Sequence, residues 1–242
     1  MWGFAPLLRR LGNDMGFTPL VVGVCSVLYA ATLLVSGRSM IVVGGGMDFL
    51  VPANFAVFLF GASGAIPVFH YGWWWTILSA GWLHGSALHI LFNMMWIRQL
   101  GPDTAEMYGP SRTVIIYTVA GAAGFLLSTL AGHALTLGAS AGIMGLLGAL
   151  VRYGQRTGSG HIRRQAWTWA LILFVLGFLM RGVDNWAHAG GFAGGYLAAL
   201  LLDPVKRERP GHMLVALLCL ALSAVAVALS FFNGLPILLN GR

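Results

Sequence analysis

The sequence is short of charged residues, and this shortage decides the class of protein. Asp, Glu, Lys and Arg make up only 9% of its 242 residues, whereas a soluble domain carries about 25%. Hydrophobic residues make up 58% and stand in long runs rather than in alternation. Because lipid offers backbone groups no hydrogen-bond partners, such runs form helices and not a membrane barrel. We therefore predict an all-α fold, a polytopic membrane helix bundle.

Cysteines and acidic residues are scarce too, and this excludes further classes. The two cysteines, Cys25 and Cys219, lie within apolar runs, which indicates small buried side chains rather than a disulfide framework. Asp and Glu number 7 against 14 Lys and Arg, which gives a net charge of +7. The basic residues fall in short clusters between apolar runs, where they orient a membrane protein. We therefore expect no nucleic-acid partner.

Seven apolar segments follow one another along the chain, and we interpret them as membrane spans. The first could mimic a signal peptide, but it is long and no A-x-A-type site follows it, so we expect an uncleaved helix. The predicted spans are 18–36, 84–100, 111–131, 140–155, 165–181, 187–202 and 212–232.

The basic residues predict the orientation of these spans. With the N-terminus in the cytoplasm, all but three of the 14 Lys and Arg residues fall in cytoplasmic segments, which is the bias expected of membrane proteins. The exceptions are Arg38, Arg181 and Arg242. We therefore expect one multi-pass membrane domain over 1–242, in a cell membrane of the prokaryotic inner or plasma membrane type.

Residues 37–82 are apolar but broken by Gly, Pro and aromatic residues, and they are too long for an ordinary loop. We predict short helical pieces at the membrane interface, either as a plain anchor or as a functional lateral surface. The tryptophans expected at the headgroup level are Trp73, Trp74, Trp75 and Trp82.

Ser140 lies at the N-terminal end of a predicted apolar helix, within the small-residue stretch LGASAGIMG that begins at Leu137. Its hydroxyl would lie where the first helical N–H groups are unpaired. Clusters of Gly, Ala and Ser also occur wherever membrane helices touch, so the stretch alone fits a packing role equally well. The predicted topology places Ser140 at the outer end of its span.

A second constellation, HGSALHILFN, runs from His84 to Asn93. His89 and Asn93 are four residues apart and share one helix face, from which both can donate hydrogen bonds to a developing negative charge. Helix–helix hydrogen bonding is the structural alternative. A metal site would need His84, His89 and His188 together, and no carboxylate that could orient them is evident.

A third constellation opens the sixth span, where His188, Gly191 and Gly195 share one face. The two glycines favour close helix packing, and we predict that this brings His188 within reach of Ser140. His188 could then take the serine proton as a base. Asp184 lies four residues earlier across a predicted turn, so we predict a Ser–His dyad rather than a triad. The facing small residues are expected at Ala141, Gly145 and Gly148.

Taken together, these motifs resemble the rhomboid intramembrane serine proteases. The matching elements are His84-Gly85-Ser86-xx-His89-xxx-Asn93, Gly138-Ala139-Ser140 and Ala187-His188-xx-Gly191-xxx-Gly195, in the family's order, within residues 70–202. The resemblance implies a six-helix core over about 18–202 and an additional seventh helix over about 212–232.

The resemblance also implies a function for these residues. Ser140 would be the nucleophile and His188 the general base, while His89, Asn93 and the Ser140 backbone N–H would form the oxyanion hole. His84 would lie near the water-accessible mouth, and Gly138, Met144, Gly191 and Gly195 would support the site. The implied reaction is hydrolysis of peptide bonds in or beside transmembrane helices of other proteins, in membrane lipid and without metal or cofactor.

Three departures from the family pattern leave a second function open. Ala141 replaces the glycine that usually follows the serine, Met144 replaces an aromatic residue expected to pack on the base, and Thr76 replaces the arginine of a Trp-Arg pair. None of them removes a reacting group, so we predict an active enzyme. The alternative is a catalytically weak or inactive rhomboid-like protein that binds transmembrane helices.

Overall fold

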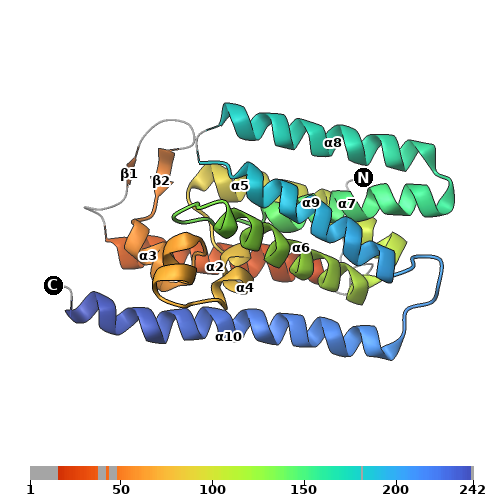
Figure 1. Cartoon of the computed structure of the whole chain (residues 1–242). Coiled ribbons are helices and arrows are strands. Elements are labelled where there is room, and N and C mark those ends of the chain that lie inside the picture. Colours follow the sequence, from red (N-terminus) through yellow and green to blue (C-terminus); the bar gives the residue numbers. More distant parts are fainter. Residues whose placement is uncertain (1–15, 38–41, 44–47, 181, 241–242) are drawn as a thin grey trace, which may run out of the picture.

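Seven long helices make up most of the part of the chain that the structure, a computed structural model, describes: residues 16–37, 42–43, 48–180 and 182–240 (Figure 1). The elements are α2 (Phe17–Ser36), β1 (Val42–Val43), β2 (Phe49–Val51), α3 (Asn54–Leu59), η3 (Ile66–His70), α4 (Thr76–Ser79), η4 (Ala80–Trp82), α5 (Ala87–Tyr108), α6 (Pro110–Leu130), α7 (Ser140–Thr157), α8 (Gly160–Leu179), α9 (Asn185–Leu201) and α10 (Pro210–Asn240).

Each predicted span coincides with one of these long helices, so the all-α prediction is confirmed. By length and composition, α2, α6, α8 and α10 can cross a membrane. Of the other three, α5 and α7 contain charged residues, and α9 is only 17 residues long. The largest boundary differences are at two C-terminal ends: α5 continues through Pro102 to Tyr108 rather than ending near residue 100, and α10 continues to Asn240 rather than ending near residue 232.

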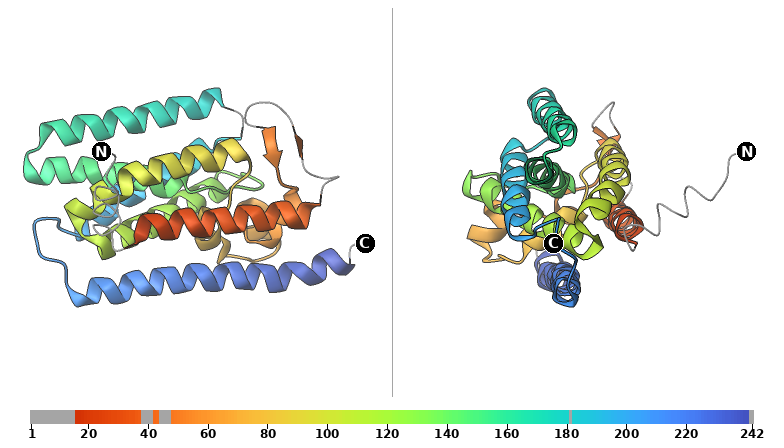
Figure 2. Two further views of the ribbon diagram at one scale, coloured as in Figure 1. Left: turned by 180° about the vertical axis from the view of Figure 1, so that it is seen from behind. Right: turned by 90° about the vertical axis from the view of Figure 1, so that its right-hand side faces the viewer.

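α7 is the central helix of the bundle. It packs against α5, α6, α8 and α9, as the end-on view shows (Figure 2), and most of its residues are buried. The predicted seam of small residues lies between α7 and α9. A Cβ on Gly195 would collide with the backbone of Gly145, and one on Gly191 would collide with the carbonyl oxygen of Ala141. The close approach of these two backbones therefore depends on glycine.

The segment before α5 forms short helices, as predicted, and also a small antiparallel pair of strands, β1 and β2, that the sequence did not predict. The expectation that all four tryptophans face lipid headgroups is wrong for Trp73 and Trp82, which are buried. Trp73 stacks on Phe58, with ring centroids 4.8 Å apart. Aromatic packing within the protein therefore outweighs interfacial exposure here, and Trp74 remains half exposed.

Side-chain hydrogen bonds connect the last helix, α10, to the rest of the bundle near its start and in its C-terminal half, in addition to apolar contacts such as that of Phe231 with Phe60. In its C-terminal half, Trp75 Nε1 donates a hydrogen bond to Ser230 Oγ at 3.0 Å. Near its start, the buried side chain of Arg112 on α6 binds the α9–α10 connection. Its guanidinium donates to the carbonyl oxygens of Asp203 and Lys206, both at 2.6 Å, and to His212 Nδ1 at 3.3 Å.

Candidate active site

Ser140 is the first residue of α7, and the loop before it crosses directly over His89. Gly138 in this loop has φ +128°, and a Cβ there would come within 2.7 Å of His89 Nε2. Its backbone N–H donates to the carbonyl oxygen of Ala80 at 3.0 Å. Only glycine satisfies both the backbone conformation and the lack of space. Gly138 therefore lets the loop bring Ser140 close to the His89 ring.

The hydrogen bonds of His89 determine which ring nitrogen carries its proton. The Gly85 N–H donates to His89 Nδ1 at 3.4 Å, so the neutral ring is protonated on Nε2. Nε2 faces Gly138 and the space beside Ser140. The backbone of His89 is fixed as well, because its N–H donates to the N-cap residue Ser86 at 3.2 Å. His89 therefore offers an oriented N–H donor next to Ser140.

Asn93 lies one turn further along α5. Its Nδ2 donates to the carbonyl oxygen of His89 at 2.8 Å, a bond within its own helix. That bond uses one of the two amide hydrogens. The second remains for another acceptor, and Asn93 lines the same cavity as His89.

His188 lies in the first turn of α9 and is buried. Its backbone N–H donates to the carbonyl oxygen of Asp184 at 3.0 Å. Both ring nitrogens lack a hydrogen-bond partner among the described residues. A buried imidazole without partners is costly, and such an orphaned group calls for an explanation such as water, ligand or catalysis.

One cavity brings the four polar side chains together. Ser140, His188, His89 and Asn93 all line a space of about 270 Å³. That volume holds several waters or a side chain, since one water occupies about 30 Å³ in the liquid. Thr136 and Asp184 also line the cavity, and most of the remaining wall is apolar, much of it from α5 and α8. It includes Phe92, Trp96, Leu173, Leu176 and Met180.

The structure corrects one of the supporting residues. His84 was expected near a water-accessible mouth, but it is fully buried and is not among the residues that line the cavity. The segment between η4 and α5 is itself buried, with Leu83 equally inaccessible. His84 packs edge-on against the ring of His89, with centroids 5.1 Å apart. Its location is therefore behind the site, not at its entrance.

The three departures from the family pattern have different surroundings. Ala141 fits because glycines face it, Gly124 on α6 and Gly191 on α9. The buried Thr76 hydroxyl is hydrogen-bonded to the Trp73 carbonyl oxygen at 2.7 Å and to Ser63 Oγ at 3.2 Å. Met144 is buried in the main apolar core and does not line the cavity.

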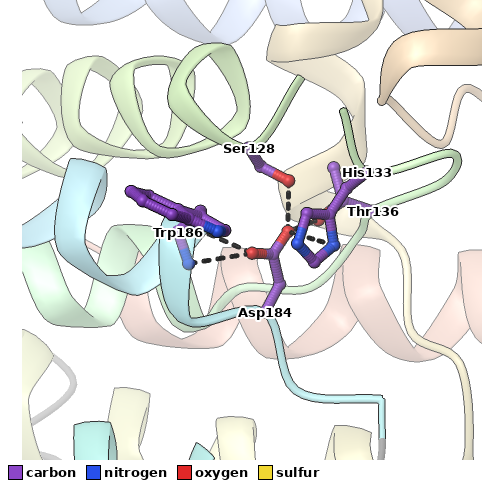
Figure 3. A network of polar contacts seen from close by, with 6 residues as sticks. Ser128, His133, Thr136, Asp184 and Trp186 are labelled. Carbon is purple, nitrogen blue, oxygen red and sulfur yellow. Dashed lines mark hydrogen bonds and ion pairs between the residues drawn. The ribbon is translucent and has the colours of Figure 1, made fainter. Parts of the chain in front are cut away.

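Asp184 has a structural environment that the sequence analysis missed (Figure 3). Its carboxylate caps α9 and binds side chains from the α6–α7 region, and these bonds leave His188 without a carboxylate partner. The signal available in the sequence was an Asp placed just before an apolar helix, which is typical of an N-cap. Among the residues described, no group of three His, Cys, Asp or Glu could hold a metal ion.

The fold and the cavity define a multi-pass helical membrane protein with a polar site enclosed among its helices. The Rhomboid domain family model matches residues 71–204, more than half of the chain. The chain therefore belongs to the rhomboid family.

Three relatives illustrate the similarity. The chain is 32% identical over 164 residues to the rhomboid protease GluP of Bacillus subtilis, covering 66% of this chain and 31% of that protein. It is 32% identical over 188 residues to RHOMBOID-like protein 7 of Arabidopsis thaliana, covering 69% and 60%. For RHOMBOID-like protein 4 of the same plant, the identity is 34% over 133 residues, covering 53% and 34%. The chain thus spans less than two thirds of the length of each relative.

Proposed function

We propose that the protein is an intramembrane serine endopeptidase that hydrolyses peptide bonds in or beside transmembrane helices of other membrane proteins. The observation that carries this proposal is the meeting of Ser140, His188, His89 and Asn93 in one cavity. Membership of the rhomboid family supports it at the level of the family. We further propose one membrane domain in a cell membrane, with the N-terminus in the cytoplasm.

In the proposed reaction, Ser140 Oγ attacks the carbonyl carbon of the substrate peptide bond while His188 accepts the serine proton. The tetrahedral oxyanion is stabilised by His89 Nε2–H, Asn93 Nδ2–H and the backbone N–H of Ser140. His188 then gives its proton to the leaving amine, and the C–N bond breaks. A water attacks the resulting ester, with His188 as base again, and this step releases the acid product and restores Ser140.

The apolar part of the cavity wall suggests how a substrate helix reaches the site. It lies between α5 and α8, and both helices expose large apolar residues outside the cavity, among them Leu91, Met95, Leu171 and Val175. We propose that substrates enter sideways from lipid between these two helices. Cross-linking α8 to α5 without loss of cleavage would contradict that route.

The alternative is a rhomboid-like protein that binds transmembrane helices with little or no cleavage. One observation favours it: Met144, at the position where an aromatic residue is expected to pack on the base, is part of the apolar core and does not line the cavity. The accommodation of Ala141 and the satisfied hydroxyl of Thr76 weaken the other two reasons.

The experiment that separates the two functions is cleavage of a model transmembrane substrate in liposomes. We expect the wild type to cleave it and Ser140→Ala to leave it intact. Ser223→Ala is the matched control, because Ser223 bonds only within α10 and lies outside the cavity. Binding of the substrate by the wild type without cleavage would support the alternative.

A further inference from the structure

The two segments that carry Ser140 and His188 are joined by the carboxylate of Asp184. One oxygen, Oδ1, accepts the backbone N–H groups of Trp186 and Ala187, both at 3.0 Å. This is an N-cap, and it fixes the first turn of α9, which carries His188.

The other oxygen, Oδ2, binds the segment that leads to the nucleophile. It accepts the hydroxyls of Ser128, in the last turn of α6, and of Thr136 at 2.7 Å. His133 Nδ1 lies 3.7 Å away. Figure 3 shows these side chains gathered around the carboxylate. Asp184 therefore links the head of α9 to the loop that ends at Ser140.

The other side of this loop is held by the backbone of the short-helix segment. Thr136 and Ser63 exchange both backbone hydrogen bonds, at 2.8 and 3.0 Å. The Ala65 N–H also donates to the carbonyl oxygen of His133, at 2.7 Å. Because one side of the loop is fixed to residues 63–65, the Asp184 bonds on its other side set its distance from α9.

We propose that Asp184 is a positioning residue that sets the placement of Ser140 relative to His188, and that it is not the third member of a catalytic triad. The proposal rests on the proposed function. A carboxylate offers about four lone-pair sites, and two backbone N–H groups and two hydroxyls occupy them here. A neutral amide could not accept all four bonds.

The mechanism predicts an effect on turnover rather than on substrate binding. Displacement of a reacting group by about 1 Å can cost on the order of 100-fold in rate. Loss of the Oδ2 bonds frees the loop before Ser140 while leaving the part of the cavity wall that comes from α5 and α8 in place. We therefore expect kcat to fall and KM to stay within about twofold.

Two substitutions separate the effect of the N-cap from the effect of the Oδ2 hydrogen bonds to Ser128 and Thr136. Serine is as good an N-cap as aspartate, so Asp184→Ser keeps the cap but loses the bonds to Ser128 and Thr136. Thr136→Val keeps the shape and backbone of Thr136 and removes only its hydroxyl. We expect kcat to fall on the order of 10-fold in Thr136→Val and up to about 100-fold in Asp184→Ser. The double variant should be no slower than Asp184→Ser, because both changes break one network.

Thr168→Val is the matched control, because Thr168 lies on the exposed part of α8 and bonds only within that helix. We expect wild-type kcat and KM from it. Unchanged kcat in both Asp184→Ser and Thr136→Val would overturn the proposal. The proposal would also be overturned if the loss of kcat in the double variant equalled the product of the losses in the two single variants.

A measurement that needs no catalysis tests the geometry itself. Spin labels at Ala134 and Trp186, both exposed, report the distance between the loop and the head of α9. With Cys25 and Cys219 replaced by alanine, we expect a narrow distance distribution. It should broaden in Asp184→Ser and stay unchanged in Ser140→Ala.

The two measurements keep the two proposals apart. If the wild type does not cleave the substrate but Asp184→Ser still broadens the distance distribution, the positioning role is supported and the proposed protease function is contradicted. Loss of kcat without any change in the distance distribution would contradict the positioning role, because Asp184 would then act on the reaction in another way. If the wild type does not cleave the substrate and Asp184→Ser leaves the distance distribution unchanged, both proposals are contradicted.

Discussion

Two buried polar regions of the protein differ in how completely their hydrogen-bonding groups are paired. At one end of α6, the Arg112 guanidinium donates to two carbonyl oxygens and to His212. In the cavity beside Ser140, neither ring nitrogen of His188 has a partner among the described residues. Asp184, near the far end of α6, resembles Arg112 in this respect, since both of its oxygens are used.

The difference indicates which polar groups hold the fold together and which are kept for another partner. A buried polar group left unpaired costs about 1–3 kcal/mol. The fold avoids that cost at Arg112 and at Asp184 but not at His188. We therefore expect substitution of Arg112, which is remote from the cavity, to lower stability, and substitution of His188, which lines the cavity, to lower activity.

The sharpest test of this comparison is His188→Ala. The change removes the proposed base, so we expect cleavage to fall by about 10⁶-fold. The temperature of unfolding in detergent should not fall, because no partner loses a hydrogen bond. An unfolding temperature far below that of the wild type would show that His188 is part of the structural framework instead.

The opposite pattern is expected for Arg112→Met. This change leaves the carbonyl oxygens of Asp203 and Lys206 without their donor, and we expect the free energy of unfolding to fall by about 3 kcal/mol. Cleavage at low temperature should persist, because Arg112 is remote from the cavity. Arg98→Met, at an exposed position of α5, is the control and should change stability by less than about 0.5 kcal/mol. Loss of cleavage in folded Arg112→Met would contradict the comparison.

A smaller loss is expected for Gly195→Ala in the seam between α7 and α9. Its Cβ would collide with the Gly145 backbone, which cannot move aside as a side chain can. We expect about 2 kcal/mol of destabilisation from overpacking. Gly23→Ala is the matched control, since nothing lies within 4 Å of a Cβ at Gly23 in α2. Equal unfolding curves for the two variants would show that the helices are not in close contact at Gly195.

The smallest effect is expected for Ser230→Ala at the attachment of α10. The substitution leaves the Trp75 indole N–H without its acceptor, and we expect a loss of about 1 kcal/mol. Ser223→Ala removes only a bond within α10 and should have almost no effect on the same unfolding curve. If the two variants behaved alike, the bond from Trp75 would not stabilise the attachment.

The sequence predicted the features that depend on local pattern. Apolar runs identified the long helices, and the spacing of Gly191 and Gly195 predicted the seam with α7. The four polar residues expected at one depth do line one cavity.

Features that depend on distant contacts escaped prediction. Asp184 binds Ser128 and Thr136, which lie 56 and 48 residues away in the sequence. Arg112 binds partners 91 to 100 residues away. Nothing in the local pattern around His84 or Trp73 indicates that packing from other segments would bury them.

The central claim is that Ser140 is a nucleophile activated by His188, and covalent labelling with mapping of the adduct tests it most directly. The protein is treated in detergent with a serine-reactive fluorophosphonate, digested and analysed by mass spectrometry. We predict one adduct, on Ser140, that forms in the wild type and in Ser223→Ala but not in His188→Ala. An adduct on another serine, or equal labelling of Ser140 in His188→Ala, would contradict the claim.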